Sequence, residues 1–177
     1  MNDITERLRG IFAALGITDE LIAGRSLRLC PEADKLEIAE IGDDGREYCL
    51  TPAATAAWRH MKHAAAADGV VLRLASAFRS IDRQVEIVRE KLAQGVTLQE
   101  ILSASAPPGY SEHHSGCAVD ITTDGVPPLE IEFEDTAAFA WLAKNAARFA
   151  FALSFPRGNR YGYQYEPWHW YYSTAIA

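Results

Sequence analysis

The chain has 177 residues, of which 49% are hydrophobic and 23% are charged, and its 17 Lys and Arg against 24 Asp and Glu give a formal net charge of −7. A single domain of this length buries enough apolar surface to be stable without disulfides or a structural metal. The acidic balance, with no run of Lys or Arg, excludes a basic footprint for nucleic acid or anionic lipid. No segment approaches the roughly 18 apolar residues of a membrane span.

The cysteines and the N-terminal residues indicate a reducing compartment. The three cysteines are far apart and form no CxxC pair, which is not the pattern of a secreted disulfide framework. Charged residues such as Glu6 and Arg7 stand where a signal peptide needs an apolar core. We therefore expect a cytoplasmic protein, or a periplasmic one if a signal has been trimmed from the chain, while the oligomeric state stays open.

Hydrophobic spacing and turn residues predict an α+β fold in which helices flank a central antiparallel sheet. In the first half of the chain they predict a helix over residues 2–15, a hairpin of strands 36–41 and 46–50, and a helix from Pro52 to near Gly69 with Thr51 as its N-cap. A strand over 70–76, helices over 81–93 and 97–103, a loop over 104–116 and a strand over 117–122 are expected next. The last predicted elements are a helix that is capped by Asp135 and extends to Phe149, and strands over 151–155 and 168–172. With no linker or repeat, the chain is expected to form one domain over 1–177, with an N-terminal helix and hairpin in 1–50 and a core in 51–172.

Imidazole and carboxylate side chains at three positions meet the needs of a catalytic zinc. Zinc takes N and O ligands in a tetrahedron, and a catalytic site draws three of them from the protein. With Asp120 on the strand over 117–122, the small Ala118 shares its face and leaves room beside the metal. His113, on the preceding loop, then folds back over that face, and His169 arrives from a neighbouring strand, which puts the zinc site in a cleft on the sheet.

Glu166 is the candidate general base. It precedes His169 by three residues, and Pro167 biases it toward an extended conformation, so it reaches the same metal without binding it. In the partly apolar setting of Trp168 and Trp170, desolvation raises the pKa of this carboxylate and the cation lowers it. A carboxylate tuned in this way activates a water nucleophile at neutral pH.

The spacing of these residues resembles the VanY-type D-alanyl-D-alanine carboxypeptidases, zinc peptidases related to the lysostaphin-type enzymes and the hedgehog signalling domain. The first half of the family motif, SxHxxGxAxD, matches at Ser111, His113, Gly116, Ala118 and Asp120, and the second half, with ExWH spacing, matches at Glu166, Trp168 and His169. Upstream, Ser76-Ala77-Phe78-Arg79-Ser80 with Gln84 resembles the family's (S)xYRSxxxQ segment, with Phe78 in the place of the usual Tyr. The resemblance covers residues 50–172.

The resemblance implies a role for each motif residue. It makes His113, Asp120 and His169 the ligands of Zn²⁺ and Glu166 the catalytic base. It makes Arg79, Gln84 and Ser111 substrate contacts, and an Arg fork suits a terminal carboxylate. Whether Arg79 binds that carboxylate or acts catalytically by polarising the scissile carbonyl stays open. His114 and Trp168 are expected to line the substrate pocket.

Other histidines and cysteines are weaker candidates. Strand alternation points Cys117 away from Asp120, which favours a buried structural thiol over a zinc ligand. His60 and His63 lie three apart on the Ala-rich helix without a third ligand, and we interpret them as surface or packing residues. Tyr171 departs from the family, in which many relatives have Arg at this position.

The expected function is zinc-dependent hydrolysis of the bond before a C-terminal D-alanine in peptidoglycan stem peptides or muropeptides, with residues 51–172 as the catalytic core. Within the family, D,D-carboxypeptidases trim pentapeptides and L,D-carboxypeptidases trim tetrapeptides to tripeptides. A cytoplasmic enzyme meets tetrapeptides recovered from the wall, which favours L,D activity in muropeptide recycling. The alternatives are a D,D-carboxypeptidase, an endolysin-type enzyme that cleaves L-alanyl-D-glutamate and normally needs access to the wall, and a non-catalytic, zinc-stabilised binding module. The retention of Glu166 argues against the module.

Overall fold

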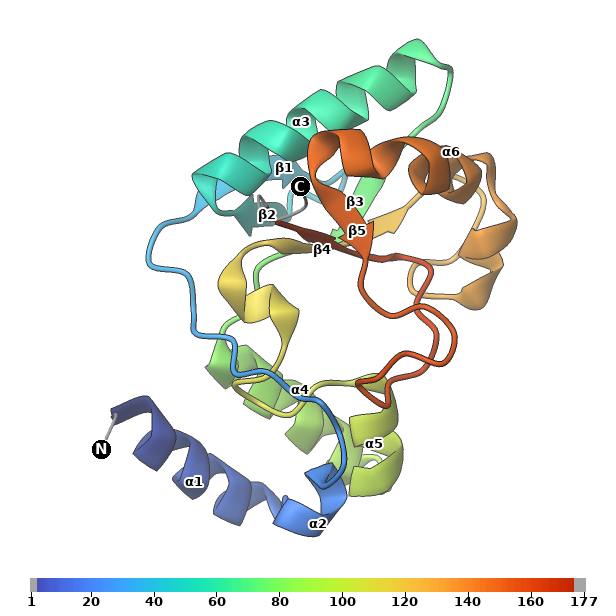
Figure 1. The fold of residues 1–177 in the computed structure, drawn as a ribbon. Helices are drawn as coiled ribbons and strands as arrows, with labels where there is room; N and C mark the ends of the chain where they lie inside the picture. The colour runs from blue at the N-terminus through green and yellow to red at the C-terminus, as the bar shows by residue number, and fades with distance from the viewer. Residues whose placement is uncertain (1–2, 174–177) are drawn as a thin grey trace.

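A four-stranded antiparallel sheet, with a separate hairpin and helices around it, forms the framework of the molecule (Figure 1). The computed structural model describes residues 3–173. Its helices are α1 (Asp3–Leu15), α2 (Asp19–Ile22), α3 (Pro52–Ala67), α4 (Ile81–Ala93), α5 (Leu98–Ala104) and α6 (Ala137–Asn145), and its 3₁₀ helices are η1 (Glu112–Ser115), η2 (Ile131–Asp135) and η3 (Ala146–Phe149). Its strands are β1 (Glu37–Ile41), β2 (Glu47–Leu50), β3 (Arg73–Ser76), β4 (Ala118–Thr122), β5 (Phe151–Leu153) and β6 (His169–Tyr172).

Strand order places the two halves of the motif side by side. The larger sheet has the order β3-β4-β6-β5, with all neighbours antiparallel, and β1 pairs with β2 in a second sheet. Asp120 on the central strand β4 is in register with Ser76 of β3 on one side and with His169 of β6 on the other. Residues far apart in sequence therefore meet at one level of the sheet.

The main core lies on the face of the sheet opposite the motif side chains. Alternation along β4 turns Val119 and Ile121 into this core, where they join Trp58 and Met61 of α3. In the view of Figure 1, α3 and α6 lie above the sheet, whereas α1, α4 and α5 lie below it. Because the core holds one face of β4, Asp120 is held on the other.

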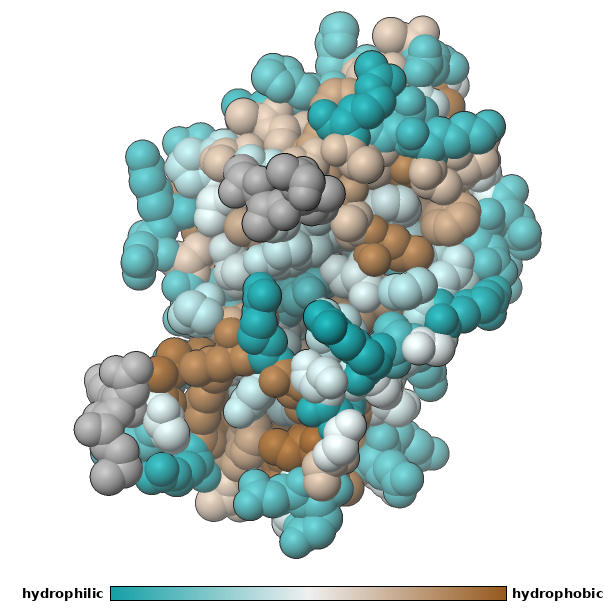
Figure 2. Space-filling view, in the orientation of Figure 1, coloured by the Kyte–Doolittle hydropathy of each residue, from teal (hydrophilic) through white to brown (hydrophobic). Residues whose placement is uncertain are grey.

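A smaller apolar cluster joins the N-terminal helix to the lower helices. It consists of Leu15, Ile17, Val85, Val88, Ile101 and Leu102. Figure 2 shows a group of apolar side chains in the lower part of the molecule, where these helices lie. No helix within residues 3–173 is long and apolar enough to cross a membrane.

The predicted fold class is confirmed, and most predicted elements lie within a few residues of the observed ones. Thr51 is the N-cap of α3 and accepts a hydrogen bond from the backbone N–H of Ala54, as predicted. The prediction of Asp135 as a helix cap is wrong: Asp135 ends η2, and Thr136 caps α6 by accepting from the N–H of Phe139. The strand predicted from residue 70 begins at Arg73, and the predicted loop over 104–116 contains η1. Residue 2 of the first predicted helix lies outside the described residues.

Candidate metal and catalytic site

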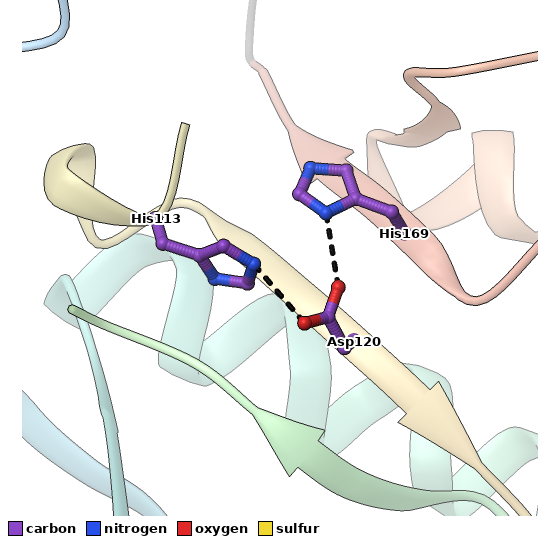
Figure 3. Close-up of side chains that lie close together, drawn as sticks. All are labelled: His113, Asp120 and His169. Atoms are coloured by element: carbon purple, nitrogen blue, oxygen red, sulfur yellow. Dashed lines mark hydrogen bonds and ion pairs between the residues drawn. The ribbon is translucent and has the colours of Figure 1, made fainter. Parts of the chain in front are cut away.

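Asp120 lies between the rings of His113 and His169, as Figure 3 shows. Its Oδ2 is 3.1 Å from Nε2 of His113, and its Oδ1 is 2.9 Å from Nδ1 of His169. The two imidazole rings are perpendicular, with centroids 4.9 Å apart. All three residues are at most 4% exposed.

The turn before β4 brings His113 over Asp120. Gly116 ends η1 with φ of +65°, a left-handed conformation that favours glycine, and its N–H donates to the carbonyl of His113. A Cβ at this position would lie 2.9 Å from Leu36 Cδ2. The Nδ1 of His113 lies 2.7 Å from the carbonyl oxygen of Ala77, which leaves Nε2 facing Asp120.

These three side chains fit a metal ion. Their potential ligand atoms lie within 4.8 Å of one another, and they are the one such group of His, Cys, Asp or Glu found in the described part of the chain. The donor set of two imidazoles and one carboxylate is also one that zinc accepts.

The charged groups around Asp120 and His169 shift the pKa values of both side chains. Burial lowers the pKa of His169, but hydrogen bonds to Asp120 and Glu112 outweigh this effect and raise the pKa to about 10. Burial raises the pKa of Asp120, but the neighbouring His113 and His169 hold it well below its usual range. The carboxylates of Asp120 and Glu112 therefore favour a positive charge at this place.

Glu166 reaches the same site from the turn before β6. The backbone N–H of His169 donates to the carbonyl of Glu166, and Glu166 Oε2 lies 3.8 Å from His169 Nδ1. Burial raises the pKa of Glu166 to about 7, with Asp120 adding to the effect and His169 and Arg79 opposing it. Its carboxylate is near the proposed metal ligands but outside the group that could hold the ion, as a general base requires.

The guanidinium of Arg79 is held by hydrogen bonds to two neighbours. Its NH1 donates to Gln84 Oε1 at 3.0 Å and its NH2 donates to Ser76 Oγ at 3.1 Å. Gln84 is fully buried, and its Nε2 donates to the carbonyl of Ala106 at 2.8 Å. Gln84 therefore orients Arg79 and does not line the cavity itself, which differs from its predicted role as a direct substrate contact.

A cavity of about 400 Å³ contains the candidate metal ligands together with Glu166, Arg79, Ser111 and Trp168. The structure thus brings most of the sequence-predicted site residues to one hollow. Besides Gln84, His114 is an exception, because its side chain is fully buried and does not line the cavity. Gly109 N–H donates to its Nε2, so Nδ1 carries the proton and donates to the carbonyl of Arg79 at 2.6 Å. The predicted pocket-lining role of His114 is therefore wrong, and the ring instead connects three loop segments.

The remaining candidates lie away from the metal ligands. The Sγ of Cys117 lies 3.6 Å from Thr51 Oγ1, and Cys117 is not part of the group that could hold an ion. His60 and His63 are exposed on α3. Glu112, in contrast, was not predicted: it lines the cavity and contacts His169, but the spacing of the sequence gives no signal for this contact.

Two buried histidines and one carboxylate, beside a glutamate that is not part of the ligand group and an arginine, make up the kind of donor set that a zinc ion accepts. The family model for VanY, described as D-alanyl-D-alanine carboxypeptidase, matches residues 47–175, and the chain belongs to this family.

Known relatives agree with this assignment. The chain is similar to the D-alanyl-D-alanine carboxypeptidase of Enterococcus faecalis, with 37% identity over 119 residues that make up 62% of this chain and 42% of the relative. Among solved structures it resembles the LD-carboxypeptidase LdcB, with a TM-score of 0.69 and 31% identity over 80% of this chain and 69% of that one. It also resembles a variant of the vancomycin resistance D,D-pentapeptidase VanY in complex with Zn(II), with a TM-score of 0.63 and 31% identity over 86% of each chain. The chain spans about two fifths of the length of the E. faecalis relative.

Proposed function

We propose that this protein is a zinc-dependent carboxypeptidase that removes a C-terminal D-alanine from peptidoglycan stem peptides. The observation that carries the proposal is the joint presence, in one cavity, of the three candidate metal ligands, Glu166 and Arg79. The activities named for the relatives support the substrate class, and the Zn(II) held by the VanY structure supports the metal.

The proposed reaction needs a Lewis acid and a general base. A bound zinc ion supplies Lewis-acid chemistry, because it lowers the pKa of water and polarises a carbonyl. Glu166 accepts the proton of the attacking water and returns it to the leaving amine, and burial, which raises its pKa, makes it a stronger base than an exposed carboxylate.

Arg79 and Ser111 orient the peptide. The guanidinium of Arg79, held by Ser76 and Gln84, offers its remaining donors to a carboxylate or to the carbonyl that develops negative charge. The Ser111 side chain lines the same cavity and offers a neutral hydrogen bond. Because Arg79 is fixed by two hydrogen bonds, less entropy is lost when the substrate binds.

Between the two activities of the family, we favour L,D cleavage, which converts a tetrapeptide to a tripeptide. The similarity to LdcB supports this choice. The similarity to a D,D-pentapeptidase supports the alternative, in which a pentapeptide loses its last residue. The role in muropeptide recycling and the cytoplasmic location stay predictions from the sequence.

A non-catalytic binding module is the second class of function. Such a module needs the metal for stability but does not need a base. Glu166 lies in the cavity with its pKa raised toward neutrality, and this favours the enzyme.

The test offers the zinc-loaded protein equal amounts of soluble tetrapeptide and pentapeptide stems and follows the products by mass spectrometry, with a chelator control. Tripeptide formed from tetrapeptide, and lost on chelation, supports the L,D enzyme. Tetrapeptide that accumulates from pentapeptide supports the D,D alternative. No release of alanine from either peptide contradicts the proposed activity.

A further inference from the structure

Glu112 is a largely buried carboxylate in the candidate site. Neither the sequence motif nor the residues beside it in the chain explain why it lies there. It begins η1, directly before His113, and its side chain is 20% exposed. Its Oε2 lies 3.0 Å from Nε2 of His169 and accepts a hydrogen bond of 2.6 Å from Ser154 Oγ. One carboxylate oxygen thus joins η1 to β6 and to the residue that follows β5.

The two nitrogens of His169 face different partners. Nδ1 faces Asp120 at 2.9 Å, on the side of the candidate metal site, whereas Nε2 faces Glu112 on the opposite side of the ring. The ring of Phe155 packs against this imidazole with centroids 4.6 Å apart. The ring is therefore held at both polar ends and packed by an aromatic neighbour.

The two candidate histidine ligands are held by different kinds of acceptor. His113 presents Nε2 to the metal site, and its other nitrogen faces the backbone carbonyl of Ala77. His169 presents Nδ1, and its other nitrogen faces the side chain of Glu112. Of these two acceptors, only the Glu112 carboxylate is charged. It is also the only one that a substitution can remove, because the carbonyl of Ala77 belongs to the backbone.

We propose that Glu112 is a positioning residue that keeps the proton of His169 on Nε2 and so directs the Nδ1 lone pair to the metal. This inference rests on the metal site of the proposed function. A carboxylate that accepts from a ligating histidine fixes its tautomer and ring orientation and increases its basicity. Ser154 has a supporting part, because its hydrogen bond fixes the Glu112 oxygen that meets the ring.

The first experiment measures zinc affinity by competition with a chelating dye, without any substrate. For Glu112→Ala we expect an affinity about 10- to 100-fold weaker than that of the wild type. Glu112→Gln keeps an acceptor oxygen of the same reach and should recover part of this loss. The matched control is Glu166→Gln, a change at a second cavity glutamate that makes no hydrogen bond to His169 Nε2, and it should keep affinity within about threefold of the wild type.

The outcomes of this experiment separate the alternatives. Wild-type zinc affinity in Glu112→Ala overturns the proposal. An equal loss of zinc affinity in Glu112→Gln and Glu112→Ala also overturns it, because the acceptor oxygen at Nε2 would then have no effect. A loss of zinc affinity in Glu166→Gln as large as that in Glu112→Ala overturns it too, because the effect would then not be specific to the carboxylate at Nε2. Wild-type protein that binds no zinc contradicts the proposed function itself, and is thus distinguishable from a failure of this inference.

A second measurement needs no variant and so does not depend on whether Glu112→Ala folds. The ¹⁵N chemical shifts of the His169 ring in the zinc-loaded wild type report which nitrogen holds the proton. We expect a protonated Nε2 and a metal-bound Nδ1, with the reverse arrangement for His113. A deprotonated Nε2 on His169 overturns the proposal.

Discussion

Asp120 and His169 face each other across neighbouring antiparallel strands, and the Nδ1 of the imidazole lies 2.9 Å from the Oδ1 of the carboxylate. The backbone pairing of β4 with β6 fixes this distance, because each side chain projects from a strand with one face held by the core. The strand register therefore brings these two side chains together, and the chemistry of the site can be tested one side chain at a time.

Substitution of Glu166 separates catalysis from metal binding. Glu166→Ala should lower the rate of D-alanine release by at least about 100-fold, because a positioned general base contributes that much or more. Zinc content should stay that of the wild type, since Glu166 is not part of the group that could hold the ion. Steady-state kinetics and metal analysis of the same sample check both points, and unchanged turnover would show that the mechanism is wrong.

Removal of Arg79 should weaken substrate use without loss of metal. A charged hydrogen bond contributes about 1.5–3 kcal/mol, so Arg79→Ala should lower kcat/KM by about 10- to 100-fold. The control is Arg83→Ala, a change at an arginine on the exposed side of α4 that pairs with Glu86 and Glu90. It should leave kcat/KM unchanged. Loss of zinc in Arg79→Ala would contradict the role assigned to this side chain.

The activity should depend on pH through Glu166. Burial raises the pKa of this carboxyl to about 7 in the metal-free site, and a bound cation lowers it again. A base must be deprotonated to act, so kcat/KM should fall as the pH drops through this pKa, with a midpoint below about 7. A profile measured between about pH 5 and pH 8 tests this, and activity that increases toward acid would exclude Glu166 as the base.

Metal binding should release a proton. In the metal-free site the pKa of His169 is raised to about 10, so its Nδ1 must lose a proton before it can bind an ion at neutral pH. About one proton per chain should leave His169 on zinc binding near pH 8, and the apparent affinity should weaken as the pH falls. Calorimetry in buffers of different ionisation enthalpy measures this number, and a value of zero would mean that His169 is not a ligand.

Loss of the metal should also lower stability. At a free zinc concentration 100 times the dissociation constant, binding stabilises the folded state by about 2.7 kcal/mol. For a chain of this size, chelation should then lower the melting temperature by about 5–10 °C. Equal melting curves with zinc and with chelator would contradict binding to the folded protein.

The Gly116 turn provides a test of how η1 is held. Gly116→Ala places a Cβ 2.9 Å from Leu36 in a backbone with φ of +65°. Gly125→Ala is a matched control, since Gly125 has φ of +86° and nothing within 4 Å of an added Cβ. Both substitutions carry the cost of the left-handed conformation, and Gly116→Ala should lose at least about 1 kcal/mol more in free energy of unfolding because of overpacking. Equal losses in urea unfolding would show that the contact with Leu36 is unimportant.

The sequence predicted the fold class and the residues that meet at the site because both depend on local patterns. Alternation over 118–122 is enough to put Asp120 opposite the core, and helical spacing is enough to locate α1, α3 and α4. The cap of α6 was misplaced by one residue because Asp135 and Thr136 are both capping residues, and only the 3₁₀ turn before them decides which one acts.

The contacts behind the site could not be predicted in this way. Glu112 meets His169 across 57 positions of sequence, and this contact depends on how η1 folds over two strands. Gln84 and His114 belong to motif segments, but both turn to loop carbonyls instead of the cavity. Motif spacing identifies the residues that gather near a site, whereas long-range register decides which of them face the substrate.

The most direct test of the central claim is a titration of the metal-free protein with zinc while D-alanine release from tetrapeptide and pentapeptide is measured. The release rate should rise in proportion to bound zinc and reach its maximum at one zinc per chain. A chelator should abolish the release. Release at the same rate without metal, or none from the fully loaded protein on either peptide, would contradict the account.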